Sequence, residues 1–174
     1  MKKTLETIAN IVVILVAVLA GALLIKNNFF KAPLARQENL AGRTISLNEI
    51  DIGATKATVL LALSPKCRFC DESAPFYRRL GSLKTSPGSG FQTVGVFGEP
   101  VETGKEYLTK EGLSTDAVVS RPLADLGVQG TPTLLVVNNK GKIVQSWIGL
   151  LNETEQKEVL DVLRTLGACD CLTE

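Results

Sequence analysis

The sequence predicts an α/β domain, in which helices cover a β-sheet, and three segments carry this prediction. Residues 57–63 form a continuous apolar run, which is typical of a strand buried on both faces. The segment after it continues with apolar residues at helical spacing. Residues 133–137 are an apolar, β-branched run, and after the turn sequence Asn138-Asn139-Lys140-Gly141 residues 142–148 are expected to return as the partner strand of a β-hairpin.

Two cysteines, Cys67 and Cys70, lie between the predicted strand and the predicted helix. In the first turn of a helix, free backbone N–H groups and the helix dipole stabilise a thiolate. A C-x-x-C pair between a strand and a helix is typical of a redox centre. The apolar residues that give the following helix its buried face are Phe76, Tyr77, Leu80 and Leu83.

Other uses of two close cysteines fit the composition less well. A structural zinc site usually needs four cysteine or histidine ligands, and this chain has no histidine. Its other thiols, Cys169 and Cys171, lie about a hundred residues away. We therefore favour disulfide exchange over a metal site or an inert structural disulfide, and we expect no metal and no cofactor. The lack of histidine also excludes Cys-His nucleophilic catalysis.

The remaining elements follow from local patterns. Asn152 and Glu155 have the spacing of a helix capping box, and the helix that follows has an apolar face ending before Gly167. Trp147 is expected to pack in the core or at its rim rather than to face a substrate. Further strands are expected at 44–47, 91–97 and 117–119, and further helices at 102–111 and 122–126.

A Thr131-Pro132 pair precedes the first hairpin strand, where proline is tolerated and a cis bond is a reasonable expectation. The order of the C-x-x-C pair, Pro75, Thr131-Pro132, Gly149 and a closing helix resembles that of thioredoxin-fold proteins. Over residues 42–166 it is most similar to the membrane-anchored thiol:disulfide oxidoreductases of the TlpA/ResA kind. The resemblance implies a thioredoxin fold, with a central mixed β-sheet flanked by helices.

The resemblance also implies roles for individual residues. Cys67 would attack a substrate disulfide, Cys70 would resolve the mixed disulfide, and Thr131 with Pro132 would dock the substrate backbone. The implied partners are protein dithiols or disulfides and a redox partner that regenerates the dithiol.

The sequence departs from the family at two positions. Lys66 replaces the tryptophan usual before the first cysteine, and Leu61 takes a strand position where many relatives bury an acid. We expect Lys66 and Arg68 to lower the pKa of Cys67 and to make the couple more oxidising, unless both are merely solvated charges.

Two other function classes stay open at this stage. One is a non-catalytic binding module, or a Cu(I) metallochaperone, built on the same scaffold. The other is a peroxiredoxin-like peroxidase, because Ser64 lies three residues before Cys67; however, Leu61 occupies the position where those enzymes have proline.

Residues 1–26 are predicted to form a single N-terminal transmembrane helix, because residues 8–25 are almost wholly apolar. A cleavable signal peptide is the alternative. Residues 27–41 would be a tether and residues 42–167 the thioredoxin-like domain. An N-terminal anchor before a dithiol domain favours export to the periplasmic side of a bacterial cell membrane. The net charge of +1 gives no indication of nucleic-acid binding.

The tail at 168–174 contains Cys169-Asp170-Cys171, which the family pattern does not explain. The closing helix should carry this pair about 20 Å from Cys67, which argues against direct exchange. Three uses stay open: an auxiliary redox relay or contact with a second protein, binding of a soft cation such as Cu(I), or a pair of accessory cysteines.

Overall fold

The computed structural model describes residues 40–84 and 90–170. The predicted anchor at 1–26, most of the tether and Cys171 lie outside the described residues. Within the described ranges, no helix is long and apolar enough to cross a membrane.

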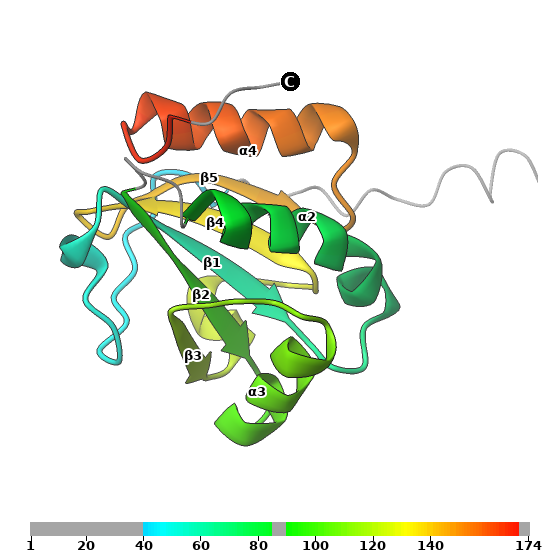
Figure 1. Cartoon of the computed structure of the whole chain (residues 1–174). Helices are drawn as coiled ribbons and strands as arrows, with labels where there is room; N and C mark the ends of the chain where they lie inside the picture. Colours follow the sequence, from blue (N-terminus) through cyan, green and yellow to red (C-terminus); the bar gives the residue numbers. More distant parts are fainter. Residues whose placement is uncertain (1–39, 85–89, 171–174) are drawn as a thin grey trace, which may run out of the picture. The chain divides into compact units, whose positions relative to one another are not determined.

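A five-stranded mixed sheet forms the centre of the domain, in the order β3-β2-β1-β4-β5 (Figure 1). β1 runs parallel to β2, and β2 runs parallel to β3, whereas β4 is antiparallel to both β1 and β5. The strands are β1 (Ala57–Leu63), β2 (Phe91–Phe97), β3 (Ala117–Ser120), β4 (Thr133–Asn138) and β5 (Ile143–Ile148).

Helices cover one face of this sheet. They are α2 (Arg68–Lys84), α3 (Val101–Lys110) and α4 (Glu153–Thr165), and Figure 1 shows α2 and α4 packed on the same side. Alternate residues of β1, such as Val59 and Leu61, pack against them. The opposite residues, Leu60 and Ala62, pack against the segment that precedes β1 and against the short helix η2 (Leu123–Leu126). Another short helix, η1 (Ile52–Ala54), lies in that preceding segment.

Most of the predicted elements are confirmed. All seven residues of β1 are buried, as the continuous apolar run predicts. The capping box forms, since the Asn152 side chain accepts from the Glu155 N–H and the Glu155 side chain accepts from the Asn152 N–H. Trp147 is 4% exposed, and its Nε1 donates to Glu158 at 3.2 Å, so its role in packing is confirmed.

The strand predicted at 44–47 is wrong. Only an isolated bridge joins Thr44 to Lys142, with a hydrogen bond from the Ile45 N–H to the Gly141 carbonyl. Leu47 is nevertheless buried in the cluster on the face opposite the helices. The apolar residues of this segment are therefore buried against the sheet, but the segment is not one of its strands.

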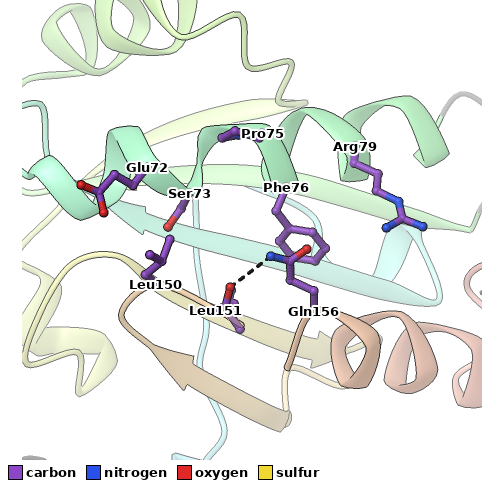
Figure 2. A pocket seen from close by; sticks show the side chains of 8 residues that line it. All are labelled: Glu72, Ser73, Pro75, Phe76, Arg79, Leu150, Leu151 and Gln156. Atoms are coloured by element: carbon purple, nitrogen blue, oxygen red, sulfur yellow. Dashed lines mark hydrogen bonds between the residues drawn. The ribbon is translucent and has the colours of Figure 1, made fainter. Parts of the chain in front are cut away.

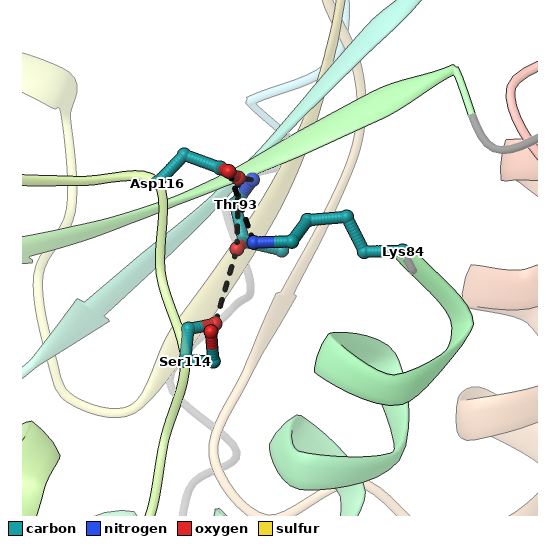
Figure 3. A network of polar contacts seen from close by, with 4 residues as sticks. All are labelled: Lys84, Thr93, Ser114 and Asp116. Carbon is teal, nitrogen blue, oxygen red and sulfur yellow. Dashed lines mark hydrogen bonds and ion pairs between the residues drawn. The ribbon is translucent and has the colours of Figure 1, made fainter. Parts of the chain in front are cut away.

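A polar network ties the end of α2 to the segment before β3 (Figure 3). Asp116 accepts from the Thr93 N–H at 2.7 Å and pairs with Lys84 Nζ at 2.9 Å. The Thr93 hydroxyl lies near both Asp116 Oδ2 and the Ser114 carbonyl. Partial burial raises the pKa of Asp116, but these hydrogen bonds and the Lys84 charge outweigh burial and lower it overall.

We expect Asp116→Asn to lower the free energy of unfolding by about 1 kcal/mol at pH 7, because it removes the charge from hydrogen bonds that the folded state forms. A carboxyl whose pKa is lowered by folding stabilises the fold above its ordinary value, and this contribution is lost as the pH falls below about 4. Urea denaturation at pH 7 and pH 3 should therefore show a gap between the two proteins that narrows in acid. An equal gap at both pH values would contradict this.

Candidate active site

The two cysteines lie at the carboxyl end of β1, where the chain turns into α2. The Cys67 N–H donates to the Ser64 carbonyl at 3.1 Å, and the Cys70 N–H donates to the Cys67 carbonyl at 3.0 Å. Cys67 precedes the first residue of α2, while Cys70 lies in its first turn. Both sulfurs are free thiols. The sequence prediction of a dithiol at a helix start is therefore matched by the geometry.

Strand pairing brings the Thr131-Pro132 segment to this turn. β1 and β4 are antiparallel, and Ala62 pairs with Thr133. The start of β4 therefore lies beside the end of β1. The Thr131–Pro132 peptide bond is cis, and the Gly149 N–H donates to the Pro132 carbonyl at 2.7 Å.

Contact between the two segments is direct. Cys67 Sγ lies 3.2 Å from the Thr131 carbonyl oxygen and donates to it as a thiol. Cys67, Cys70, Thr131 and Pro132 thus gather at one edge of the sheet, although Cys70 and Thr131 are 61 positions apart in the sequence.

Cys67 is partly exposed and is poised to ionise. Burial raises the pKa of its thiol, but hydrogen bonds with the side chains of Cys70 and Thr131 and with the backbone of Cys70 and Phe69 outweigh burial. The pKa of Cys67 is therefore lowered, and its thiolate is more abundant at neutral pH than that of an ordinary cysteine.

Cys70 behaves in the opposite way. Its side chain is fully buried, and burial is the largest cause that raises its pKa to about 12. The hydrogen bond with Cys67 and the charge on Cys67 add to this rise. One cysteine is accessible and acidic, and the other is shielded and protonated, which is the asymmetry that ordered disulfide exchange requires.

Lys66 and Arg68 lie on either side of Cys67, and both are exposed. Arg68 Nε pairs with Glu72 at 2.7 Å, and the Arg68 side chain is 86% exposed. Lys66 is exposed as well. The groups that lower the pKa of Cys67 are hydrogen-bond partners, so tuning by Lys66 and Arg68 stays a prediction from the sequence.

The buried side of the dithiol carries no acid. Leu61 packs in the same cluster as Cys70, and no aspartate or glutamate of residues 40–84 and 90–170 is buried. The sequence did not indicate a nearby polar pair: the Tyr107 hydroxyl donates to Asp71 Oδ1 at 3.0 Å, one residue after Cys70. No local signal links α3 to the start of α2, so only the fold could reveal this pair.

Cys169 lies at the end of the sheet opposite the dithiol. Cys169 is buried and disulfide-bonded, and the neighbouring Ala168 carbonyl accepts from the Gly90 N–H at 2.7 Å. Gly90 precedes β2, at the edge opposite the dithiol. The expectation that Cys169 lies away from Cys67 agrees with this position, and Cys171 lies outside the described residues.

The large apolar side chains that are exposed in the described residues all lie near the dithiol edge: Phe69, Ile148 and Leu150. Leu150 also lines a depression between α2 and the loop after β5 (Figure 2). Polar side chains that line this depression have partners: Glu72 pairs with Arg68, and Gln156 Nε2 donates to the Leu151 carbonyl at 3.0 Å. An exposed apolar surface at a reactive site is typical of protein recognition.

Comparison with known proteins agrees with this geometry. The chain is 26% identical over 132 residues to the thiol-disulfide oxidoreductase ResA of Halalkalibacterium halodurans, and the match covers 73% of this chain and 72% of that protein. The chain is a thioredoxin-like homologue of the ResA-type oxidoreductases. No protein-family model matches it.

Solved structures support the fold of this ResA-like protein. The crystal structure of a thioredoxin-like superfamily protein, SPOA0173, superposes with a TM-score of 0.57 at 15% identity, covering 76% of this chain and 99% of that one. A secreted thiol-disulfide isomerase from Corynebacterium glutamicum gives a TM-score of 0.51 at 19% identity, covering 64% and 71% of the two chains.

Across the described ranges, no group of three or more His, Cys, Asp or Glu side chains could hold a metal ion. The chemistry that the arrangement can perform is that of its two thiols.

We expect iodoacetamide at pH 7 to modify Cys67 of the reduced protein and to leave Cys70 largely unmodified, because their pKa values are shifted in opposite directions. Cys67→Ser should lower the pKa of Cys70 below about 12 and still leave it above the ordinary value, since burial is the main cause. Peptide mapping by mass spectrometry over a range of pH values measures both. Equal modification of the two thiols at pH 7 would contradict the assignment.

Proposed function

We propose that this protein exchanges disulfides with extracytoplasmic proteins through the Cys67-Cys70 pair. The observation that carries the proposal is the partly exposed, acidic Cys67 Sγ, 3.2 Å from the Thr131 carbonyl and adjacent to a buried Cys70. A small-molecule enzyme would not need the exposed apolar side chains that surround the dithiol.

In the reducing direction, the Cys67 thiolate attacks one sulfur of the substrate disulfide. A bond forms between Cys67 and that sulfur, and the other substrate sulfur leaves as a thiolate that takes a proton from water. Cys70 then loses its proton, attacks Cys67 Sγ and releases the second substrate sulfur. The substrate gains two electrons and two protons, and Cys67-Cys70 becomes a disulfide. The oxidising direction is the reverse.

Thr131 and Pro132 would hold the substrate chain during this exchange. The Thr131 carbonyl faces Cys67 Sγ and is an acceptor for a substrate backbone N–H. The hydrogen bond from Gly149 to the Pro132 carbonyl fixes the loop. A second redox protein would restore the starting state of the dithiol.

The proposed location is the periplasmic side of a bacterial cell membrane, with residues 42–167 as the catalytic domain. The apolar segment at 8–25 supports a single anchor in the membrane. The similarity to a secreted isomerase supports an extracytoplasmic domain. Disulfide exchange with protein clients also fits an oxidising compartment.

We expect Cys70→Ser to accumulate mixed disulfides with protein partners, because the substituted enzyme can form the first bond and cannot resolve it. Wild type should reduce insulin, and Cys67→Ser should neither reduce insulin nor trap partners. Non-reducing electrophoresis before and after dithiothreitol measures the adducts. An absence of trapped partners, together with full biological activity of Cys67→Ser, would favour a non-catalytic binding module.

We expect the reduction potential of the Cys67-Cys70 couple to be more oxidising than that of a cytosolic thioredoxin, because the lowered pKa of Cys67 stabilises the reduced form. Equilibration with glutathione buffers, followed by alkylation, measures it. A potential at or below about −270 mV would count against this expectation.

A further inference from the structure

The depression between α2 and the loop after β5 is separate from the dithiol, because neither Cys67 nor Cys70 lines it (Figure 2). It holds about 220 Å³, which is less than the roughly 300–1,000 Å³ of typical small-molecule sites. Phe76, Leu150 and Leu151 give it apolar walls. The space therefore fits one large side chain of a polypeptide better than it fits a free small molecule.

Arg79 supplies the charge of this depression. The other polar side chains that line it, Glu72, Ser73 and Gln156, each have a hydrogen-bond or ion-pair partner. Arg79 is exposed, and among the described residues it has neither kind of partner. The charge of Glu72 is balanced by Arg68 at 2.7 Å. One positive charge is therefore left without an opposite charge at this place.

The depression continues the exposed apolar surface near the dithiol. Leu150 is 48% exposed and belongs to both. Ser73, which also lines the depression, follows Cys70 by three residues on α2. Figure 2 places Glu72 and Arg79 at opposite ends of the row of lining side chains. A polypeptide joined to Cys67 that extends over Leu150 therefore enters the depression.

The chemistry of the walls defines what such a polypeptide must carry. An apolar side chain placed against Phe76 and Leu150 leaves water, which is favourable. The guanidinium group of Arg79 is planar and always charged, and it can bind a carboxylate through two parallel hydrogen bonds. A lysine or arginine of the partner would instead meet a like charge. An acidic residue next to a large apolar residue satisfies both parts of the surface.

We propose that this depression anchors the polypeptide that exchanges disulfides with Cys67, by receiving a large apolar side chain and pairing Arg79 with an adjacent aspartate or glutamate. The proposal rests on the proposed function and defines its substrate class. The substrates are cysteine-containing polypeptides that present an apolar and acidic pair at a distance from the reacting cysteine.

The test uses the full reduced chain and four symmetrical peptide disulfides. Each peptide has one cysteine, a glycine-serine spacer of varied length, and one of the pairs Phe-Glu, Phe-Gln, Phe-Lys or Ala-Glu. With the spacer that reaches the depression, wild type should react about fivefold faster with Phe-Glu than with Phe-Lys, as one exposed ion pair allows. The Ala-Glu peptide should react more slowly than Phe-Glu, since it buries less apolar surface. Alkylation followed by mass spectrometry measures the second-order rate constants.

Variants separate the charge of the depression from its apolar walls. Arg79→Gln should bring the rates for Phe-Glu and Phe-Lys together, and Arg79→Glu should reverse their order. Leu150→Ala should reduce the preference for Phe-Glu over Ala-Glu. The matched control is Lys157→Gln, which removes an exposed cation of α4 that does not line the depression, and it should keep the wild-type preference.

The outcomes distinguish the anchoring surface from the proposed function. Equal rates with the four peptides at every spacer length, or a preference for the acid that survives in Arg79→Gln, would overturn the role of the depression. If no peptide reacts in a manner that depends on Cys67, the proposed function itself fails. If Arg79→Gln does not fold, the salt dependence of the wild type decides, because a preference for the acid that 1 M salt leaves unchanged is not electrostatic.

Discussion

The antiparallel pairing of β1 with β4 is the constraint on which the site depends. The carboxyl end of β1 carries the cysteine turn, and the amino end of β4 carries Thr131-Pro132. Because the two strands run in opposite directions, these ends meet at one edge of the sheet. The register that pairs Ala62 with Thr133 sets the contact between Cys67 Sγ and the Thr131 carbonyl. A shift by one residue would turn the side chains of β4 to the opposite faces.

The same architecture makes two identical side chains chemically different. Cys67 stands before α2, where hydrogen bonds favour its thiolate. Cys70 lies one turn on, where α2 packs on the sheet and Leu61 lies in the same buried cluster. Burial then holds the Cys70 proton. No aspartate or glutamate of the described residues is buried beneath the dithiol.

Much of the fold could be predicted because local patterns reflect local physics. The continuous apolar run of 57–63 becomes the central strand, and the residues at helical spacing after Cys70 become the buried face of α2. The capping box of α4 forms between residues three apart. The segment 44–47 covers the sheet and is not one of its strands, and its sequence does not reveal this, because apolar residues that cover a sheet and apolar residues within one give similar short patterns.

The amino-acid sequence is enough to identify the groups that can do chemistry: two thiols at a helix start, a Thr-Pro pair before a strand, and no histidine to assist them. The surroundings of these groups, in contrast, arise from the folded chain. The neighbours of Cys67 and Cys70 come from distant parts of the chain, as do the Ser64–Glu99 and Asp71–Tyr107 pairs. Such contacts depend on strand order and register, which bring together residues that no local pattern connects.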